Sequence, residues 1–142
     1  MKPLVALPLV IVLAGVTGLL QAADPAAGNA KLEGTWVAVS VVDRGTVDER
    51  LKSTPLKLIV KDDKYVYQVG GQSFAARFKA DATIKPMTID VTFEEGPAKG
   101  RIMLAIYSIE GDELKICGSE EKRPKEFAPT AQVLFTFKRE KP

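Results

Sequence analysis

The sequence predicts an all-β protein: an antiparallel up-and-down barrel of about eight strands, with one short helix after the first strand. From Leu32 onward apolar and polar side chains alternate with a period of two, and the helical period is largely absent. Short turn sequences separate these segments at intervals of roughly 8 to 15 residues, as suits antiparallel neighbours. Closure would remove the exposed edges of such a sheet, and a two-sheet sandwich is the alternative.

The chain opens with three predicted strands, and the segments Leu56–Lys61, Lys64–Val69 and Ser73–Lys79 are expected to form consecutive hairpins. The β-branched run Trp36–Val42 predicts the first strand, and the alternating segment Leu56–Lys61 predicts the second. The polar pair Asp62-Asp63 then turns the chain into a third strand, Lys64–Val69.

Two further strands follow, and the second of them carries the clearest alternation in the chain. The pair Gly70-Gly71 turns into a fourth strand, Ser73–Lys79, whose two phenylalanines share one face. Met87–Phe93 alternates apolar with polar residues throughout and predicts a fifth strand with one face in the core and the other in solvent.

Three further strands complete the predicted barrel. The loop Glu94–Gly100 contains Gly and Pro and leads to a sixth strand, Arg101–Ile109. The turn Gly111-Asp112 joins it to a seventh strand, Leu114–Cys117, and Val133–Arg139 forms the last strand.

One helix signal follows the first strand. Thr46-Val47-Asp48-Glu49 fits the capping-box pattern, in which the first Thr and the Glu satisfy each other's backbone amides. We therefore expect a short helix or turn over Val47–Ser53, stopped before Pro55, which would close one end of the barrel.

The first 23 residues have the pattern of a secretory signal peptide. Lys2 provides the positive start, Leu4–Leu20 is an uncharged apolar run, and small residues precede Asp24. An uncleaved membrane anchor is the alternative, but the run is shorter than the roughly 20 residues that span a bilayer. We expect cleavage, a flexible leader over residues 24–30 and one barrel domain over residues 31–140. The protein would be exported, periplasmic or secreted, with no stable membrane anchor.

Composition excludes several kinds of site. The chain has no His, so it offers no Ser/His/Asp triad and no His-ligated zinc, and its single Cys cannot form an internal disulfide. The acid pairs Asp62-Asp63, Glu94-Glu95 and Glu120-Glu121 are expected in solvated turns rather than facing each other across a cleft. The loop Glu120–Glu126 mixes acids with bases, which disfavours nucleic acid as a partner. No enzyme activity, metal or cofactor is expected.

The start and the end of the barrel domain carry a family resemblance. Gly34 and Trp36 open the first strand in a Gly-x-Trp pattern, which resembles the signature of lipocalin-like barrels. The resemblance implies that Trp36 packs at the closed end and that a basic residue of the last strand covers it. Arg139, on the same face as Phe135 and Phe137, matches that position.

Four longer motifs resemble one group in particular, the uncharacterised lipocalin-like domain family abundant in planctomycete bacteria. They cover most of the predicted domain and are LEGTWVAVS (32–40), KPMTIDVTFEEGPAKG (85–100), AIYSIEGDELKIC (105–117) and RPKEF (123–127). The family has no established activity, so the resemblance implies a fold and transfers no catalytic residue.

Three residues could carry chemistry, and each also has a structural interpretation. Asp112 follows Gly111 in a tight turn, a position that Asp tolerates. Cys117 is either a reactive or pairing thiol or a buried structural residue. Cys117 lies beside Ile116 in a short strand, where a small buried hydrophobic residue is the usual role. Asp90 is either solvent-facing between two threonines or ion-paired with Arg123. That pair would fasten the long loop Glu120–Thr130 across the barrel mouth.

Aromatic residues on the predicted strands either fill the barrel or line a ligand pocket. Small residues at Ala38, Ala76 and Ala105 would leave room beside the rings. The candidate ligand-binding residues are Arg77, Phe78, Phe93, Tyr107 and Phe135, with Arg77 and Tyr107 as polar handles for a head group.

The sequence therefore favours an exported, non-enzymatic lipocalin-like domain that binds a small apolar ligand inside the barrel. The alternative is a filled barrel that acts outside the cytoplasm as a protein-interaction or structural module. In that case the loops after Gly70, Phe93 and Cys117 would form its contact surface.

Overall fold

The computed structural model describes residues 31–128 and 132–141. The predicted signal peptide and leader lie outside these residues, as does Thr130 of the last long loop. The elements follow in this order: β1 (Gly34–Asp43), β2 (Thr46–Val47), the 3-10 helix η3 (Glu49–Lys52), β3 (Leu56–Lys61), β4 (Lys64–Val69), β5 (Gln72–Asp81), β6 (Met87–Phe93), β7 (Ile102–Glu110), β8 (Glu113–Ser119) and β9 (Val133–Arg139).

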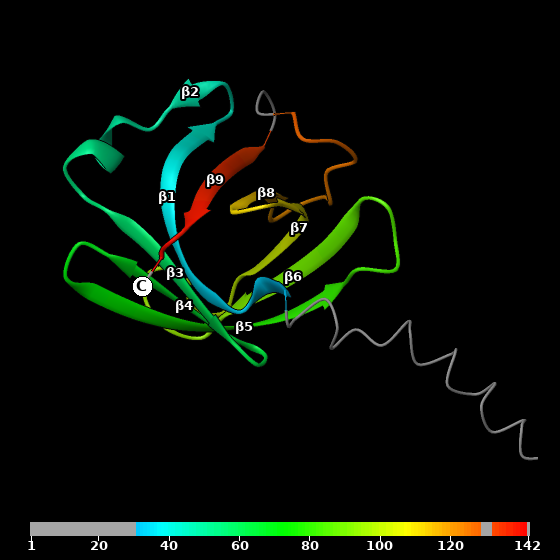
Figure 1. Ribbon diagram of the computed structural model, residues 1–142, viewed down its shortest axis with the longest axis horizontal. Helices are drawn as coiled ribbons and strands as arrows, with labels where there is room; N and C mark the ends of the chain where they lie inside the picture. The colour runs from blue at the N-terminus through cyan, green and yellow to red at the C-terminus, as the bar shows by residue number, and fades with distance from the viewer. Residues whose placement is uncertain (1–30, 129–131, 142) are drawn as a thin grey trace, which may run out of the picture.

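Eight of the nine described strands close into an antiparallel barrel (Figure 1). From β3 to β9 each strand pairs with the next, and β1 joins β3 on one side and β9 on the other. The short strand β2 pairs only with the last two residues of β1, Val42 and Asp43. The all-β, up-and-down, eight-stranded fold predicted from the sequence is confirmed, and the sandwich alternative is wrong because β1 pairs with β9.

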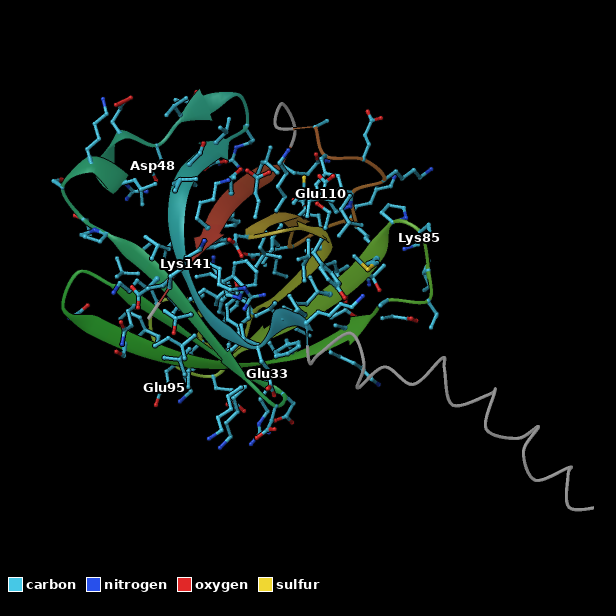
Figure 2. All side chains as sticks on the ribbon, in the orientation of Figure 1. Glu33, Asp48, Lys85, Glu95, Glu110 and Lys141 are labelled. Carbon is cyan, nitrogen blue, oxygen red and sulfur yellow. The ribbon has the colours of Figure 1, made fainter. Side chains whose placement is uncertain are left out.

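The alternating strand directions give the barrel two different ends. The closed end holds the start of β1 and the turns β3–β4, β5–β6 and β7–β8, while the open end holds the connections β1–β3, β4–β5, β6–β7 and β8–β9. Asp48, in the β1–β3 connection, and Lys85, in the β5–β6 loop, lie on opposite sides of the barrel (Figure 2). By the bounds of the strands, the open end carries the longer connections.

Three tight turns set the register of the hairpins as predicted. The pairs Asp62-Asp63, Gly70-Gly71 and Gly111-Asp112 each link strands whose flanking residues are directly opposed. Their first residues have φ of 57°, 64° and 61°, which Gly adopts freely and Asp tolerates.

Side chains fill the closed half of the barrel. Most of the largest fully buried residues face inward from six strands, and no polar or charged residue is buried among those that the structure describes. They include Trp36, Leu58, Ile89, Val91, Tyr107, Leu114, Ile116 and Phe137. This packing leaves the open half as the place for a cavity.

Arg139 caps the closed end over Trp36, as the family resemblance implied. The guanidinium carbon lies 4.1 Å from the centroid of the indole ring. The same guanidinium donates to the carbonyls of Glu33 at 2.8 Å and Lys31 at 3.1 Å. The indole nitrogen of Trp36 donates to Leu32 O at 2.9 Å. These contacts tie the last strand to the segment that begins the first.

The predicted capping box does not form. Arg44 and Gly45, with φ of 48° and 86°, fold the chain back so that Thr46 and Val47 pair with β1 as strand β2. Asp48 instead caps a single four-residue 3-10 turn, accepting from Arg50 N at 3.0 Å. The predicted helix over Val47–Ser53 therefore begins too early, because Val47 pairs with β1 as part of β2 and Asp48 is the N-cap.

A β-bulge changes the alternation of β1. The register against β9 shifts between Ala38 and Ser40, which leaves Val39 without an opposed residue and half exposed. As a result Ala38 and Val41 are both buried on the inner side, although simple alternation would place them on opposite faces.

We expect Gly34→Ala to destabilise the barrel by about 1 to 3 kcal/mol. Gly34 has φ of +129°, and an added Cβ would lie 2.7 Å from Arg139 Nη1. Urea unfolding followed by the fluorescence of the single Trp measures the effect. Gly71→Ala is the control, because its Cβ would meet no atom within 4 Å. Equal unfolding midpoints for the two variants would contradict this account of the closed end.

Candidate functional site

Two cavities lie at the open end of the barrel. The first has a volume of about 570 Å³ and is lined by Arg44, Phe93, Ala98, Met103, Gly118, Ser119, Glu120, Glu121, Gln132, Val133 and Phe135. The second has a volume of about 410 Å³ and is lined by Val41, Asp48, Arg50, Leu51, Thr54, Leu56, Val69 and Phe135. Phe135 belongs to both, so the cavities meet at this side chain.

The first cavity has apolar walls and a polar rim. Phe93, Met103 and Val133 provide side chains from three different strands. Gly118 leaves space for its neighbour, since a Cβ there would lie 2.7 Å from Met103 Cγ. At the rim, the backbone amide of Arg44 donates a hydrogen bond to the carbonyl of Gln132 at 3.0 Å. This pattern suits a largely apolar ligand with a small polar part.

Aromatic contacts separate the cavities from the filled core. Phe135 stacks on Phe137, with ring centroids 6.0 Å apart, and Phe137 is buried below it. On the other wall Phe93 meets Tyr67 edge to face at 5.7 Å. The floor of the open end is thus built from rings that are already packed on their lower side.

Some of the predicted ligand-binding residues line a cavity, and others are buried in the core. Phe93 and Phe135 line the first cavity. Phe78 and Tyr107 also face inward, but both are buried in the core and line neither cavity. The expected room beside Ala76 and Ala105 is not part of these cavities either, because both residues are buried in the same packed core.

Tyr107 does not act as a handle at the open end. Its hydroxyl is buried and has no hydrogen-bond partner within the described part of the chain. Burial raises the pKa of the phenol above its usual value, so the group stays protonated at neutral pH. Its ring fills the barrel near Met87 and Ile116, its neighbours on the adjacent strands.

The expectation for Arg77 is wrong. Ala76 and Phe78 take the inward positions of β5, so Arg77 lies on the outer face. Its guanidinium contacts Asp63 Oδ2 at 3.1 Å and Glu94 Oε2 at 3.0 Å, where it joins a turn to the end of β6. The polar groups that do reach the first cavity, such as Arg44 and Gln132, come from connections that show no periodic signal in the sequence.

Residues 120–128, here called the outer strap, are fastened to the barrel wall by Arg123. Its Nη2 lies 2.6 Å from Asp90 Oδ1, and its Nη1 donates to Ala105 O at 2.8 Å. The structure thus forms the Asp90 ion pair. Because Asp90 lies on the outer face, between the buried Ile89 and Val91, this contact holds the strap against the wall instead of across the mouth.

The outer strap covers a second, smaller apolar cluster. Cys117 and Ile106 are opposed on the outer face of the barrel, yet both are fully buried, and Pro124 of the strap is buried too. Cys117 Sγ lies 4.0 Å from Ala128 O, to which it donates. Burial raises the pKa of the thiol, so Cys117 is a structural residue as predicted.

In comparisons with known proteins, no family model, no curated protein and no solved structure matches this chain. Over residues 31–128 and 132–141, no group of three or more Cys, Asp and Glu residues is arranged to hold a metal ion. The helical segments described by the structure include none with the length and apolar character needed to cross a membrane.

We expect Arg123→Ala to raise the reaction rate of Cys117 with N-ethylmaleimide about tenfold, because the strap opens more often once its ion pair is lost. Mass spectrometry over time gives the rate. The control is Arg101→Ala, which removes the more exposed contact of Arg101 with Glu120 at 3.4 Å and should change the rate little. An unchanged rate in Arg123→Ala would show that Arg123 does not hold the strap.

Proposed function

We propose that this chain is an exported, non-enzymatic binding protein that holds a small, largely apolar molecule at the open end of its barrel. The observation that carries the proposal is the meeting of the two cavities at Phe135. Each has a size typical of small-molecule sites. The opposite end is filled and capped by Arg139, which leaves the open end as the place for a ligand.

The polar groups near the cavities suit binding better than catalysis. Asp48 accepts two hydrogen bonds from the side chain of Arg50, at 2.9 and 2.7 Å, and these lower the pKa of its carboxyl to about 2. Glu120 is held by Arg101. With its pKa lowered by Arg50, Asp48 stays ionised and does not supply a proton at neutral pH. The chain also has no His to act as an acid or base near neutral pH.

Export and family membership belong to the same proposal. Residues 1–23 have the signal-peptide pattern, and Gly34, Trp36 and Arg139 match the lipocalin-like signature in sequence. Export would place the protein in the periplasm or outside the cell, where a small apolar compound needs a carrier or a sensor. The contact of Arg139 with Trp36 supports the family assignment.

The alternative function is a protein-interaction or structural module. It is favoured by the filled closed half and by the exposure of Val39 and Val47 on the outer surface near the open end. Such a module would use its loops and would not need the cavities.

We expect Val133→Trp to weaken binding of the fluorescent apolar dye N-phenylnaphthylamine at least about tenfold, since the indole would occupy the first cavity. The mature domain, residues 24–142, is titrated with the dye, and native mass spectrometry reports any molecule that copurifies. Ile102→Trp is the matched control, because Ile102 is 49% exposed on the outer face of β7. A protein that copurifies with nothing and binds no dye would exclude the carrier function and favour the interaction module.

A further inference from the structure

The barrel wall has a gap between β1 and β3 on the side of the open end. β1 pairs with β3 only from Gly34 to Val37, and its upper end pairs with β2 at Val42 and Asp43. Between these positions no described strand pairs with that side of β1. The bulge at Val39 lies in the same stretch, which bends the strand away from its lower course.

The 3-10 helix η3 lies in this gap. It follows β2 and precedes β3 in the chain, and in Figure 1 it is the short helical turn between these two strands. Leu51 is partly buried and packs against the barrel core, although no residue of η3 is fully buried. This contact fills the gap where the strands separate.

Leu51 separates an inner cavity from an outer hollow. It lines the second cavity inside the barrel, together with Leu56, Val69 and Phe135. It also lines a hollow of about 280 Å³ on the other side, together with Val39 and Val47, whose side chains are exposed. Val41 and Asp48 line both spaces as well, so Leu51 lies with them between the hollow and the interior at this point of the wall.

Few contacts hold η3 in place. Asp48 N donates to Val41 O at 2.8 Å, which anchors the start of the turn to β1. The other polar contacts of the turn are internal: Arg50 with Asp48, Lys52 with Glu49, and the amides of Ser53 and Thr54 with Arg50 O. A single turn with internal ion pairs and one partly buried side chain opens at low free-energy cost and can move as a unit.

We infer that this gap is a side entrance to the barrel, with Leu51 as its plug, and that the second cavity receives the hydrocarbon part of the ligand. Val41, Leu51, Leu56, Val69 and Phe135 make the cavity predominantly apolar. Its charged groups, Asp48 and Arg50, are paired with each other at the rim. The ligand part of this inference rests on the proposed function, whereas the opening of the wall does not.

Thiol labelling tests the entrance without any ligand. In a Cys117→Ser background, cysteine is placed at Val41, beside the plug, or at Met103, in the first cavity. The two sites are 8% and 9% exposed, so they form a matched pair. Each is combined with Leu51→Ala or Leu51→Phe, and the rate of reaction with N-ethylmaleimide is measured after an intact fold is verified by Trp36 fluorescence.

At the Val41→Cys site we expect labelling about tenfold faster with Leu51→Ala than with Leu51, and slower with Leu51→Phe. At the Met103→Cys site we expect the labelling rate not to depend on residue 51. Equal rates for the three residues at position 51 would overturn the inference. So would the same acceleration at both sites, since that would mean a general loosening of the barrel.

Dye kinetics separate this inference from the proposed function. Stopped-flow measurements with N-phenylnaphthylamine should show faster association and faster dissociation in Leu51→Ala. Dissociation should accelerate more than association, because the substitution also removes apolar surface from the second cavity. Ile102→Ala is the control, because Ile102 is exposed on β7 and lines neither the second cavity nor the outer hollow. If the wild type binds no dye, the proposed function fails, while the labelling rates still decide whether the wall opens at Leu51.

Discussion

The contact between Arg139 and Trp36 joins the two ends of the barrel domain. The guanidinium lies over the indole and donates to backbone carbonyls at Glu33 and Lys31, which are 106 and 108 residues away in sequence. This brings the last strand against the first and so closes the sheet into a barrel. Gly34 makes the approach possible, because any side chain there would meet the guanidinium. Closure of the barrel and burial of its core depend on this corner.

The same closure explains why the two ends differ. Tight turns and the Arg139 cap hold the closed end, where the core excludes solvent. The longer connections gather at the open end, and the two cavities lie there. Binding sites tend to occur on connections supported by a rigid scaffold, and this barrel provides such a scaffold at one end only. The outer strap adds rigidity from outside through Arg123.

Departures from regular strand geometry create the features of greatest functional interest. The bulge at Val39 brings Val41 inward, and the turn at Arg44 directs the chain into β2 instead of straight into β3. Together they open the wall above Val37 and leave Leu51 to fill it. A barrel with uninterrupted pairing between β1 and β3 would have neither the second cavity in this form nor a side entrance.

The sequence by itself determined the strands, the three tight turns and the closed-end signature, because alternation, turn residues and the Gly-x-Trp pattern are local. It also contained the signal that excludes Arg77 from the interior, since alternation with Phe78 places the two on opposite faces. Tertiary structure alone decided the bulge at Val39, the pairing that displaced the capping box, and the choice of partner for Asp90. Each of these features depends on a strand or loop that is distant in sequence. The division between a filled core and open cavities is also decided by tertiary structure, because it follows from how eight strands pack around one axis.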